Sequence, residues 1–267
     1  MKTIVGNYEV IKELGEGGFA TTYLVKHLIL GVDACLKQNL EISPEDESLL
    51  IKEARLLWNI HHHSLPTLRD FLRCEDGSYA LIMSFVKGKD LFKFNGEEKP
   101  RQMNLEDVCW ITQRLLNAIH YLNYQGIVHG DIKPHNIMLT ADEEGNSDHN
   151  AVLVDYGLST FKPGRKSRCL GCSPAFAAPE QLEGKAPLPE TDIYGLGISM
   201  LYALGGDIGA KTIPESVPKK MRVFFQKMIV RDIDMRPKSA GDLIRPLSDL
   251  REELFGRRSS GRKLKIF

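Results

Sequence analysis

The sequence lacks three features that would place it in a specialised class of protein. Its 35 basic and 35 acidic residues cancel, so the charge excess typical of a dedicated nucleic-acid binder is missing. No apolar run approaches the ~20 residues that a membrane-spanning helix needs, so we expect no membrane span. The N-terminal residues lack the apolar core of a signal peptide. Five cysteines do not suggest a disulfide framework, which favours a reducing, cytoplasmic setting.

The composition is otherwise that of an ordinary globular protein, and 267 residues with 42% hydrophobic residues can bury a sizeable core. In the first third of the chain the pattern predicts short strands and one helix, which begins at Pro44 after the capping residue Ser43. Asp76-Gly77 between two of these strands predicts a hairpin. Farther along, helical periodicity dominates, most clearly over 105–124.

We therefore predict an α+β protein with two lobes. Residues 1–86 form a small, strand-rich lobe, residues 87–255 form a larger, mainly helical lobe, and residues 256–267 form a basic tail that we expect to be mobile. The helical lobe should also contain two short strands, 136–140 and 151–154, joined by a solvated polar loop.

A glycine-rich segment, Gly15-Glu16-Gly17-Gly18-Phe19-Ala20, lies between two of the expected strands. A dinucleotide-binding fold requires such a turn to open a helix, so this context argues against that fold. Glycines at this place would let backbone N–H groups approach phosphate oxygens. An ordinary glycine-rich hairpin is the alternative interpretation.

Lys37 ends a strand-like run, and Glu53 falls on the apolar face of the following helix, in step with Leu49, Leu56 and Leu57. A carboxylate that faces a core needs a partner, because an unpaired buried charge is very costly. We expect Lys37 to be that partner, the simpler alternative being an exposed lysine at a strand end. A Lys–Glu pair beside a glycine loop would hold the amine over phosphates.

Polar residues also mark the ends of the two short strands of the second lobe. The segment His129-Gly130-Asp131-Ile132-Lys133-Pro134-His135-Asn136 leads into the first strand, and Asp155 follows the second. In an antiparallel hairpin the start of one strand faces the end of the other, so Asn136 and Asp155 should come together. Two oxygen ligands there suit Mg²⁺, and Asp131 could accept a hydroxyl proton. Separate Asx-turns would explain any one of these residues but not the set.

Taken in order, the segments GxGxxA, ACLK, a glutamate on a helix, HGDIKPHN, DYG and AAPE resemble the catalytic core of protein kinases over roughly residues 8–250. The resemblance implies a bilobal kinase fold and phosphoryl transfer from Mg²⁺-ATP to serine or threonine hydroxyls of protein substrates. A pseudokinase that binds nucleotide or acts as a scaffold is the alternative class, and a small-molecule kinase is a third. No nucleic-acid partner is expected, and the oligomeric state stays open.

The resemblance also implies a set of nucleotide contacts. Phe19 would cap the phosphates, while Lys37, oriented by Glu53, would bind the α- and β-phosphates. Met83 resembles the gatekeeper that precedes the hinge, whose backbone would hydrogen-bond adenine, and Met138 would form part of the adenine floor. The full implied set is Leu14, Gly15, Gly17, Phe19, Thr22, Cys35, Lys37, Met83, Ser84, Phe85, Val86 and Met138.

For catalysis, the resemblance implies that Asp131 is the base and that Lys133 steadies the transferred phosphoryl group. Lys133 at this spacing resembles serine/threonine kinases rather than tyrosine kinases. Asn136 and Asp155 would bind magnesium. Phosphoryl transfer depends mostly on positioning and charge neutralisation, so this arrangement would constitute the mechanism.

Other matching positions are structural. The resemblance implies a buried ion pair between Glu180 and Arg236, two residues that count against a small-molecule kinase. Asp192 opens an almost wholly apolar helix expected over 192–204. It would anchor the backbone of the catalytic loop or act as an N-cap, and the two roles are compatible.

The chain departs from the kinase pattern at several positions. Gly130 replaces the arginine that usually precedes the catalytic aspartate and meets an activation-loop phosphate. We therefore expect the loop to adopt its working shape without phosphorylation. Ala20 stands at the third glycine, and Tyr156 replaces a phenylalanine, so its hydroxyl needs a partner or water. The stretch from Asp192 to Arg236, where a helix usually docks substrates or regulators, is shorter than usual.

Three further motifs are left open. Cys169 and Cys172 form a C-x-x-C pattern, which could be redox-active, half of a zinc site, or two ordinary loop thiols. His61-His62-His63 resembles a metal-binding tract but occupies a turn where kinases often place histidine. The candidate phosphorylation sites in the activation segment are Ser159, Thr160, Ser167 and Ser173.

Overall fold

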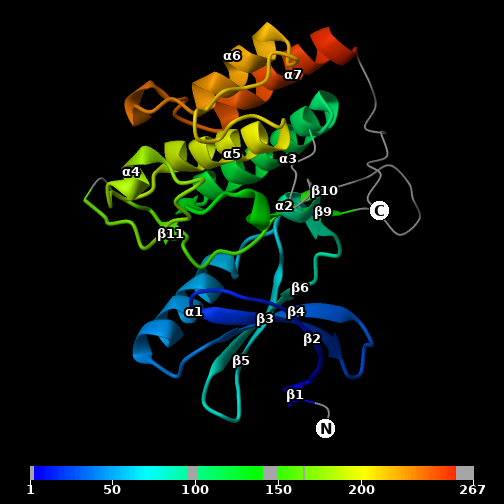
Figure 1. Ribbon diagram of the computed structural model, residues 1–267. Coiled ribbons are helices and arrows are strands. Elements are labelled where there is room, and N and C mark those ends of the chain that lie inside the picture. The colour runs from blue at the N-terminus through cyan, green and yellow to red at the C-terminus, as the bar shows by residue number, and fades with distance from the viewer. Residues whose placement is uncertain (1–2, 95–101, 141–149, 165, 257–267) are drawn as a thin grey trace. The chain divides into compact units, whose positions relative to one another are not determined.

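A computed structural model describes residues 3–94, 102–140, 150–164 and 166–256 of the chain (Figure 1). The chain divides into two compact units, Met1–Val86 and Lys87–Phe267. The predicted basic tail lies outside the described residues except for Gly256, as does most of the predicted polar loop, residues 141–149.

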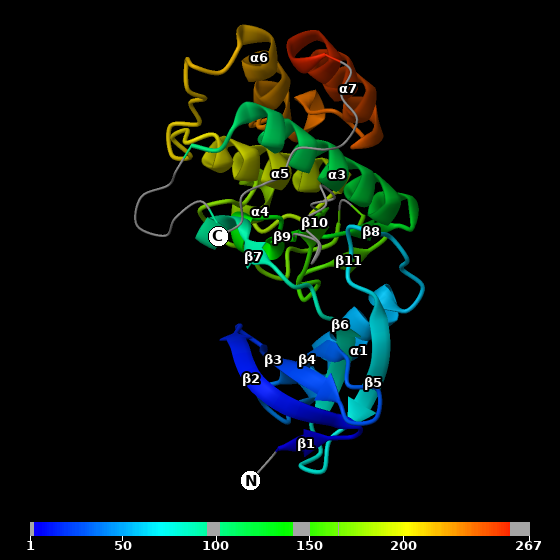
Figure 2. The ribbon, with the colours of Figure 1, turned by 90° about the vertical axis from the view of Figure 1, so that its right-hand side faces the viewer.

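The first unit is an antiparallel sheet with one helix beside it (Figure 2). The helix α1 (Pro44–Leu57) packs against three of the six strands, β4, β5 and β6. In spatial order the strands are β1 (Ile4–Val5), β2 (Tyr8–Glu16), β3 (Ala20–His27), β4 (Asp33–Asn39), β6 (Tyr79–Ser84) and β5 (Leu68–Arg73).

Local sequence signals set the boundaries of these elements. The Ser43 side chain accepts the backbone N–H of Asp46 at 3.1 Å, and Pro44 occupies the first helical position, as predicted. Gly77 turns the β5–β6 hairpin with a φ of 93°, a conformation that glycine adopts without steric cost. The predicted helix start and hairpin are therefore confirmed.

The second unit is mainly helical. The apolar helix α5 is buried along nearly its whole length, and α3 packs against α5 and α7. In both views, α6 and α7 lie on one side of the α3–α5 layer and the short strands on the other (Figures 1 and 2). The helices are α2 (Leu91–Phe94), α3 (Leu105–Tyr124), α4 (Pro179–Leu182), α5 (Pro189–Ala203), α6 (Lys219–Met228) and α7 (Gly241–Phe255), with 3₁₀ turns η1 (Pro134–Asn136) and η2 (Ile233–Met235).

Two small sheets complete this unit, and they carry the loops that matter for chemistry. One has the order β10-β9-β7 and the other pairs β11 with β8, all antiparallel. Within the described part of the chain, no helix is both long and apolar enough to cross a membrane. The strands are β7 (Lys89–Asp90), β8 (Ile127–Val128), β9 (Ile137–Thr140), β10 (Asn150–Leu153) and β11 (Thr160–Phe161).

Candidate active site

In the first unit, Lys37 and Glu53 form the ion pair that the helical spacing predicts. Lys37 lies on β4 and Glu53 on α1, and the Lys37 Nζ donates to Glu53 Oε2 at 2.7 Å and to Oε1 at 3.0 Å. Only 12% and 3% of the two side-chain surfaces are exposed. A buried charge that loses its partner is strongly destabilising, so each residue holds the other in place.

The glycine-rich segment forms the turn between β2 and β3. Gly17 donates its backbone N–H to the carbonyl of Ala20 at 2.9 Å, which closes the turn. A Cβ atom at Gly15 or Gly18 would meet nothing within 4 Å, and neither residue has a positive φ. The hairpin itself therefore does not require glycine at these two positions, whereas close approach of a ligand to the backbone would favour it.

One face of this sheet carries five of the twelve implied nucleotide contacts. Thr22 pairs with Gly15 on β2 and with Lys37 on β4, and Cys35 on β4 pairs with Met83 on β6. Cross-strand partners and residues two positions apart point to the same face of a sheet. The register thus aligns Thr22, Lys37 and Cys35 in adjacent rows on the face that carries Met83.

The remaining implied contacts lie outside that face. Ser84 donates its backbone N–H to the carbonyl of Thr67 at 2.9 Å, so this amide is already used within the sheet. Phe85 and Val86 follow β6 at the end of the first unit, whereas Met138 belongs to β9 of the second. Leu14 and Phe19 are exposed, as are Gly15 and Gly17.

In the second unit, three side chains donate hydrogen bonds to the carboxylate of Asp131. Lys133 Nζ contacts Oδ2 at 2.7 Å, Asn136 Nδ2 contacts Oδ2 at 3.1 Å, and Ser173 Oγ contacts Oδ1 at 2.9 Å. Lys133 also donates to Ser173 Oγ at 2.7 Å. A carboxylate has about four acceptor positions, so this one can still accept a hydrogen bond from an incoming hydroxyl group.

Ser173 is the member of this network that the sequence did not single out for the site. It was one of four candidate phosphorylation sites, and its hydroxyl instead links Lys133 to Asp131. Ser173 and Asp131 lie too far apart in the chain for a local sequence pattern to predict their contact. The position of Ser173 shortly before the Ala178-Pro179-Glu180 segment is the one sequence feature that places it near the site.

The backbone of the catalytic loop is held by a buried aspartate on α5. Asp192 accepts the backbone N–H groups of His129 at 2.9 Å and of Gly130 at 2.8 Å. Burial raises the pKa of Asp192 to about 6, although hydrogen bonds from Gly130, His129 and Asn123 favour its charged form. The predicted anchoring role is therefore present in the structure.

The alternative role of Asp192 as an N-cap is wrong. The helix α5 begins at Pro189, three residues earlier than predicted, so Asp192 lies inside its first turn. The hydroxyl of Thr191 accepts the backbone N–H of Leu188 at 2.9 Å and stabilises the start of the helix. Pro189 at the first helical position is the sequence signal that marks this earlier start.

The two implied magnesium ligands lie at the same end of the β9–β10 hairpin. The backbone N–H of Val154 donates to the carbonyl of Asn136 at 2.9 Å, and Asp155 follows directly with a positive φ of 67°. Asn136 itself belongs to the turn η1, one residue before the strand in which it was predicted. Because its Nδ2 donates to Asp131, its Oδ1 is the atom left to bind a metal ion.

Tyr156, which stands where kinases usually have phenylalanine, is buried. Its hydroxyl donates to the carbonyl of Leu153 at 3.2 Å, and its ring lies 4.9 Å from the ring of His129. His129 is itself buried, and burial lowers its pKa, which favours the neutral imidazole. The extra hydroxyl therefore has the hydrogen-bond partner that it requires.

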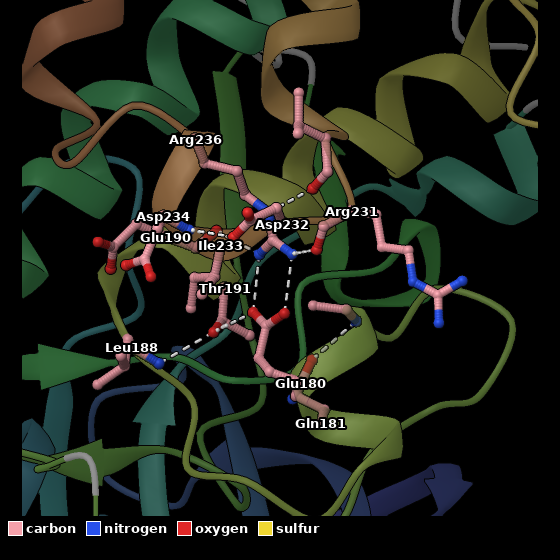
Figure 3. A network of polar contacts seen from close by, with 12 residues as sticks. Glu180, Gln181, Leu188, Glu190, Thr191, Arg231, Asp232, Ile233, Asp234 and Arg236 are labelled. Atoms are coloured by element: carbon pink, nitrogen blue, oxygen red, sulfur yellow. Dashed lines mark hydrogen bonds and ion pairs between the residues drawn. The ribbon is translucent and has the colours of Figure 1, made fainter.

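The predicted ion pair between Glu180 and Arg236 is present and buried (Figure 3). The two Arg236 Nη atoms contact the two Glu180 carboxylate oxygens at 2.7 and 2.8 Å. Thr191 also donates to Glu180, and Arg236 Nε donates to the carbonyl of Val230 at 2.7 Å. This bidentate network ties α4 and α5 to the segment after α6.

The remaining motifs give no metal site: the described residues contain no group of three or more His, Cys, Asp or Glu side chains that could hold an ion. Cys169 and Cys172 are not joined by a disulfide, and Cys169 Sγ contacts the carbonyl of Gly171 at 3.0 Å. Burial, with the proximity of Cys169 and of the Asp131 carboxylate as smaller causes, raises the pKa of Cys172 and so disfavours its thiolate.

A two-unit α+β fold with a lysine–glutamate pair, an aspartate in a polar loop and a buried Glu–Arg pair defines the class of kinase catalytic domains. The family model described as protein kinase domain matches residues 8–262. The chain belongs to this family. It is also 30% identical over 244 residues, 87% of this chain, to hormonally up-regulated neu tumor-associated kinase homolog A of Xenopus laevis, of which it spans 33%.

Proposed function

We propose that this chain is an active serine/threonine kinase that transfers phosphoryl groups from Mg²⁺-ATP to protein substrates. The observation that carries the proposal is the hydrogen-bonded network around Asp131, in which Lys133, Asn136 and Ser173 fix the carboxylate. Hydrogen-bond donors and acceptors that are already fixed in place need no reorganisation during the reaction. Such positioning is the main contribution that a protein makes to phosphoryl transfer.

In this proposal each polar residue has one task. Asp131 orients the acceptor hydroxyl and accepts its proton, and Lys133 places a positive charge where negative charge develops. Lys37 holds the nucleotide phosphates, and Glu53 holds Lys37. Asn136 and Asp155 offer the amide and carboxylate oxygens that Mg²⁺ prefers. The ion, when bound, supplies neutralisation of phosphate charge.

The site of Lys133 supports hydroxyl acceptors of serine and threonine. Its ammonium group contacts both Asp131 and Ser173, so the lysine and the proposed base act at one point. A compact point charge on a long stem can reach a transferred phosphoryl group next to that base. We also retain the proposal of a cytoplasmic protein, on its cysteine usage alone.

The test compares the native chain with Asp131→Asn, which keeps the size of the side chain and removes the base. Each protein is incubated with Mg²⁺-ATP and a generic basic protein, and mass spectrometry identifies the modified residues. We expect Asp131→Asn to lose roughly 10²- to 10⁴-fold in rate, the usual contribution of a positioned base. Asp249→Asn, an exposed change on α7, is the matched control and should keep full activity.

The pseudokinase alternative gives a different result in the same experiment. The native chain would bind ATP, seen as a rise in melting temperature, yet modify no residue of either protein. Modification of tyrosine alone would contradict the serine/threonine assignment and leave the kinase assignment intact. Equal rates for the native chain and Asp131→Asn would contradict the role of Asp131.

A further inference from the structure

A pocket of about 370 Å³ lies within the second unit, between the segment that follows Ser173, the helix α5 and the loop after α5. Its volume falls in the range of specific ligand sites, which is about 300 to 1,000 Å³. Tyr194 and Ile198 of α5 are almost fully buried, and Leu182 is 59% exposed. The larger apolar side chains that line the pocket are those of Leu182, Tyr194, Ile198 and Ile208.

One wall of the pocket is a compact turn in the loop after α5. Asp207 and Thr212 pair through two backbone hydrogen bonds of 3.1 Å, and the Asp207 carboxylate accepts the N–H groups of Gly209 and Ala210. Lys211 sits between these contacts with a φ of 57°, a strained value for a residue with a side chain. The turn therefore fixes the backbone of Lys211 beside the pocket.

The charged residues of the lining are mostly positive. Lys211 Nζ lies 5.8 Å from the ring centre of Tyr194, and Arg231 also lines the pocket. Figure 3 shows the Arg231 guanidinium directed away from the Glu180–Arg236 pair. Neither Lys211 nor Arg231 forms an ion pair with any described residue, whereas Glu183, the one lining carboxylate, pairs with Lys185 at 2.5 Å.

We propose that this pocket binds an acidic segment of the protein substrate, with an apolar side chain against Tyr194 and Ile198 and a neighbouring carboxylate on Lys211 and Arg231. An unneutralised pair of cations beside an apolar floor matches that chemistry. The occupant is the substrate because the pocket begins at Pro174, directly after the Ser173 that contacts Asp131. The inference rests on the proposed kinase function and names its substrate class.

The experiment measures phosphorylation of peptides that carry one central Ser or Thr, with one flanking position at a time fixed as Glu, Gln, Lys or Leu. For the native chain we expect one position to favour Leu and a neighbouring position to favour Glu over Lys. The double variant Lys211→Glu/Arg231→Glu should lower kcat/KM for the Glu peptides by roughly five- to tenfold, since each contact is charge-assisted. Its kcat/KM for the Gln peptides should change much less than its kcat/KM for the Glu peptides.

The matched control is Lys219→Glu/Lys227→Glu, which makes the same change of charge at two exposed positions of α6. It should keep the native preference, which separates contact at the pocket from the net charge of the protein. A native chain that phosphorylates the peptides without favouring Glu overturns this inference alone, and so does an unchanged preference in the pocket variant.

A second readout does not depend on catalysis. Fluorescein-labelled pools with Glu or Lys beside Leu are titrated with the native chain and both variants, and binding is followed by fluorescence polarisation. Tighter binding of the Glu pool by the native chain and the control, lost in the pocket variant, supports the inference. Such binding with no phosphoryl transfer would overturn the proposed function, while equal binding of the two pools would overturn the inference.

Discussion

The Lys37–Glu53 pair shows how the free-energy cost of burying a charge allows an ion pair to be predicted from the sequence. Glu53 falls on an apolar helix face, and a buried carboxylate needs a cation, which Lys37 supplies at 2.7 Å. Ser173 gave no comparable sign, since a half-buried serine in a loop satisfies every local rule. The pairing of a charged residue that falls on an apolar helix face could therefore be predicted from the sequence. The contacts of the Ser173 hydroxyl group could not.

The same pair supports a prediction about stability. Breaking a buried ion pair leaves an uncompensated charge, whereas replacing both members with apolar residues removes the desolvation cost as well. We expect Glu53→Leu to lower the free energy of unfolding by about 3 kcal/mol, and Lys37→Met/Glu53→Leu to lie close to the native value. Urea unfolding followed by fluorescence provides the measurement.

Activity serves as the contrasting readout for these two variants. Both should lose phosphoryl transfer, because the proposed contact with the nucleotide phosphates needs the lysine held by its carboxylate. A double variant that is as unstable as Glu53→Leu would show that the pair contributes through packing rather than charge.

At the scale of elements, the sequence predicted the helices that are long enough to show a repeating hydrophobic pattern. The helix over Leu105–Tyr124 matches its predicted range, and the buried helix α5 begins three residues earlier and ends one residue earlier than predicted. Two-residue strands such as β8 and β11 contain no period to detect, so the pairing of Thr160 with Val128 was not predictable. These short elements nevertheless fix the start of the activation segment beside the catalytic loop.

Several contacts hold the activation segment without a phosphate group. Ser159 Oγ donates to the carbonyl of His129 at 3.1 Å, and Gln181 Nε2 donates to that of Gly130 at 2.7 Å. Gly130 has a φ of 77°, and a Cβ there would lie 3.1 Å from the carbonyl of Leu158. Glycine thus removes the usual phosphate-binding cation and also permits this turn, while the hydrogen bonds of Ser159 and Gln181 hold the segment beside the loop.

We therefore expect activity to survive removal of phosphate from the protein. The purified chain is treated with a phosphatase, mass spectrometry verifies complete dephosphorylation, and the initial rate of peptide phosphorylation is compared with that of mock-treated protein. The two rates should agree within about twofold, because Gly130 supplies no cation for a phosphate on the activation segment. Loss of activity that returns on rephosphorylation would contradict this expectation.

At the scale of the whole molecule, the site depends on residues that the sequence places far apart. Asp192 reaches His129 and Gly130, and Ser173 reaches Asp131, through the folding of the second unit. Motif spacing predicted the residues within each loop, but the pocket beside Lys211 arises from how a turn packs on α5. A cavity is a gap that side chains leave when elements pack together, so neither hydrophobic periodicity nor motif spacing indicates where it lies.

The Glu180–Arg236 pair, which joins residues 56 positions apart in the chain, makes the stability of the fold depend on pH. Burial raises the pKa of Glu180, but the hydrogen bond and charge of Arg236 more than offset it, so the folded-state pKa lies below the ordinary value. The unfolded chain therefore binds a proton at higher pH than the folded chain does. The stability that this pair contributes is complete above the unfolded pKa of about 4.3 and declines as pH falls through the folded value.

Glu180→Gln should thus have a lower free energy of unfolding than the native chain at pH 7, by about 3 kcal/mol, because Arg236 stays buried without its anion. Its stability should also fall less steeply than that of the native chain as pH is lowered below about 4.3, because the titrating group is gone. Urea unfolding at a series of pH values between 3 and 7 measures both effects. Parallel pH profiles for the two proteins would assign the acid sensitivity to other carboxylates and leave Glu180 with a packing role only.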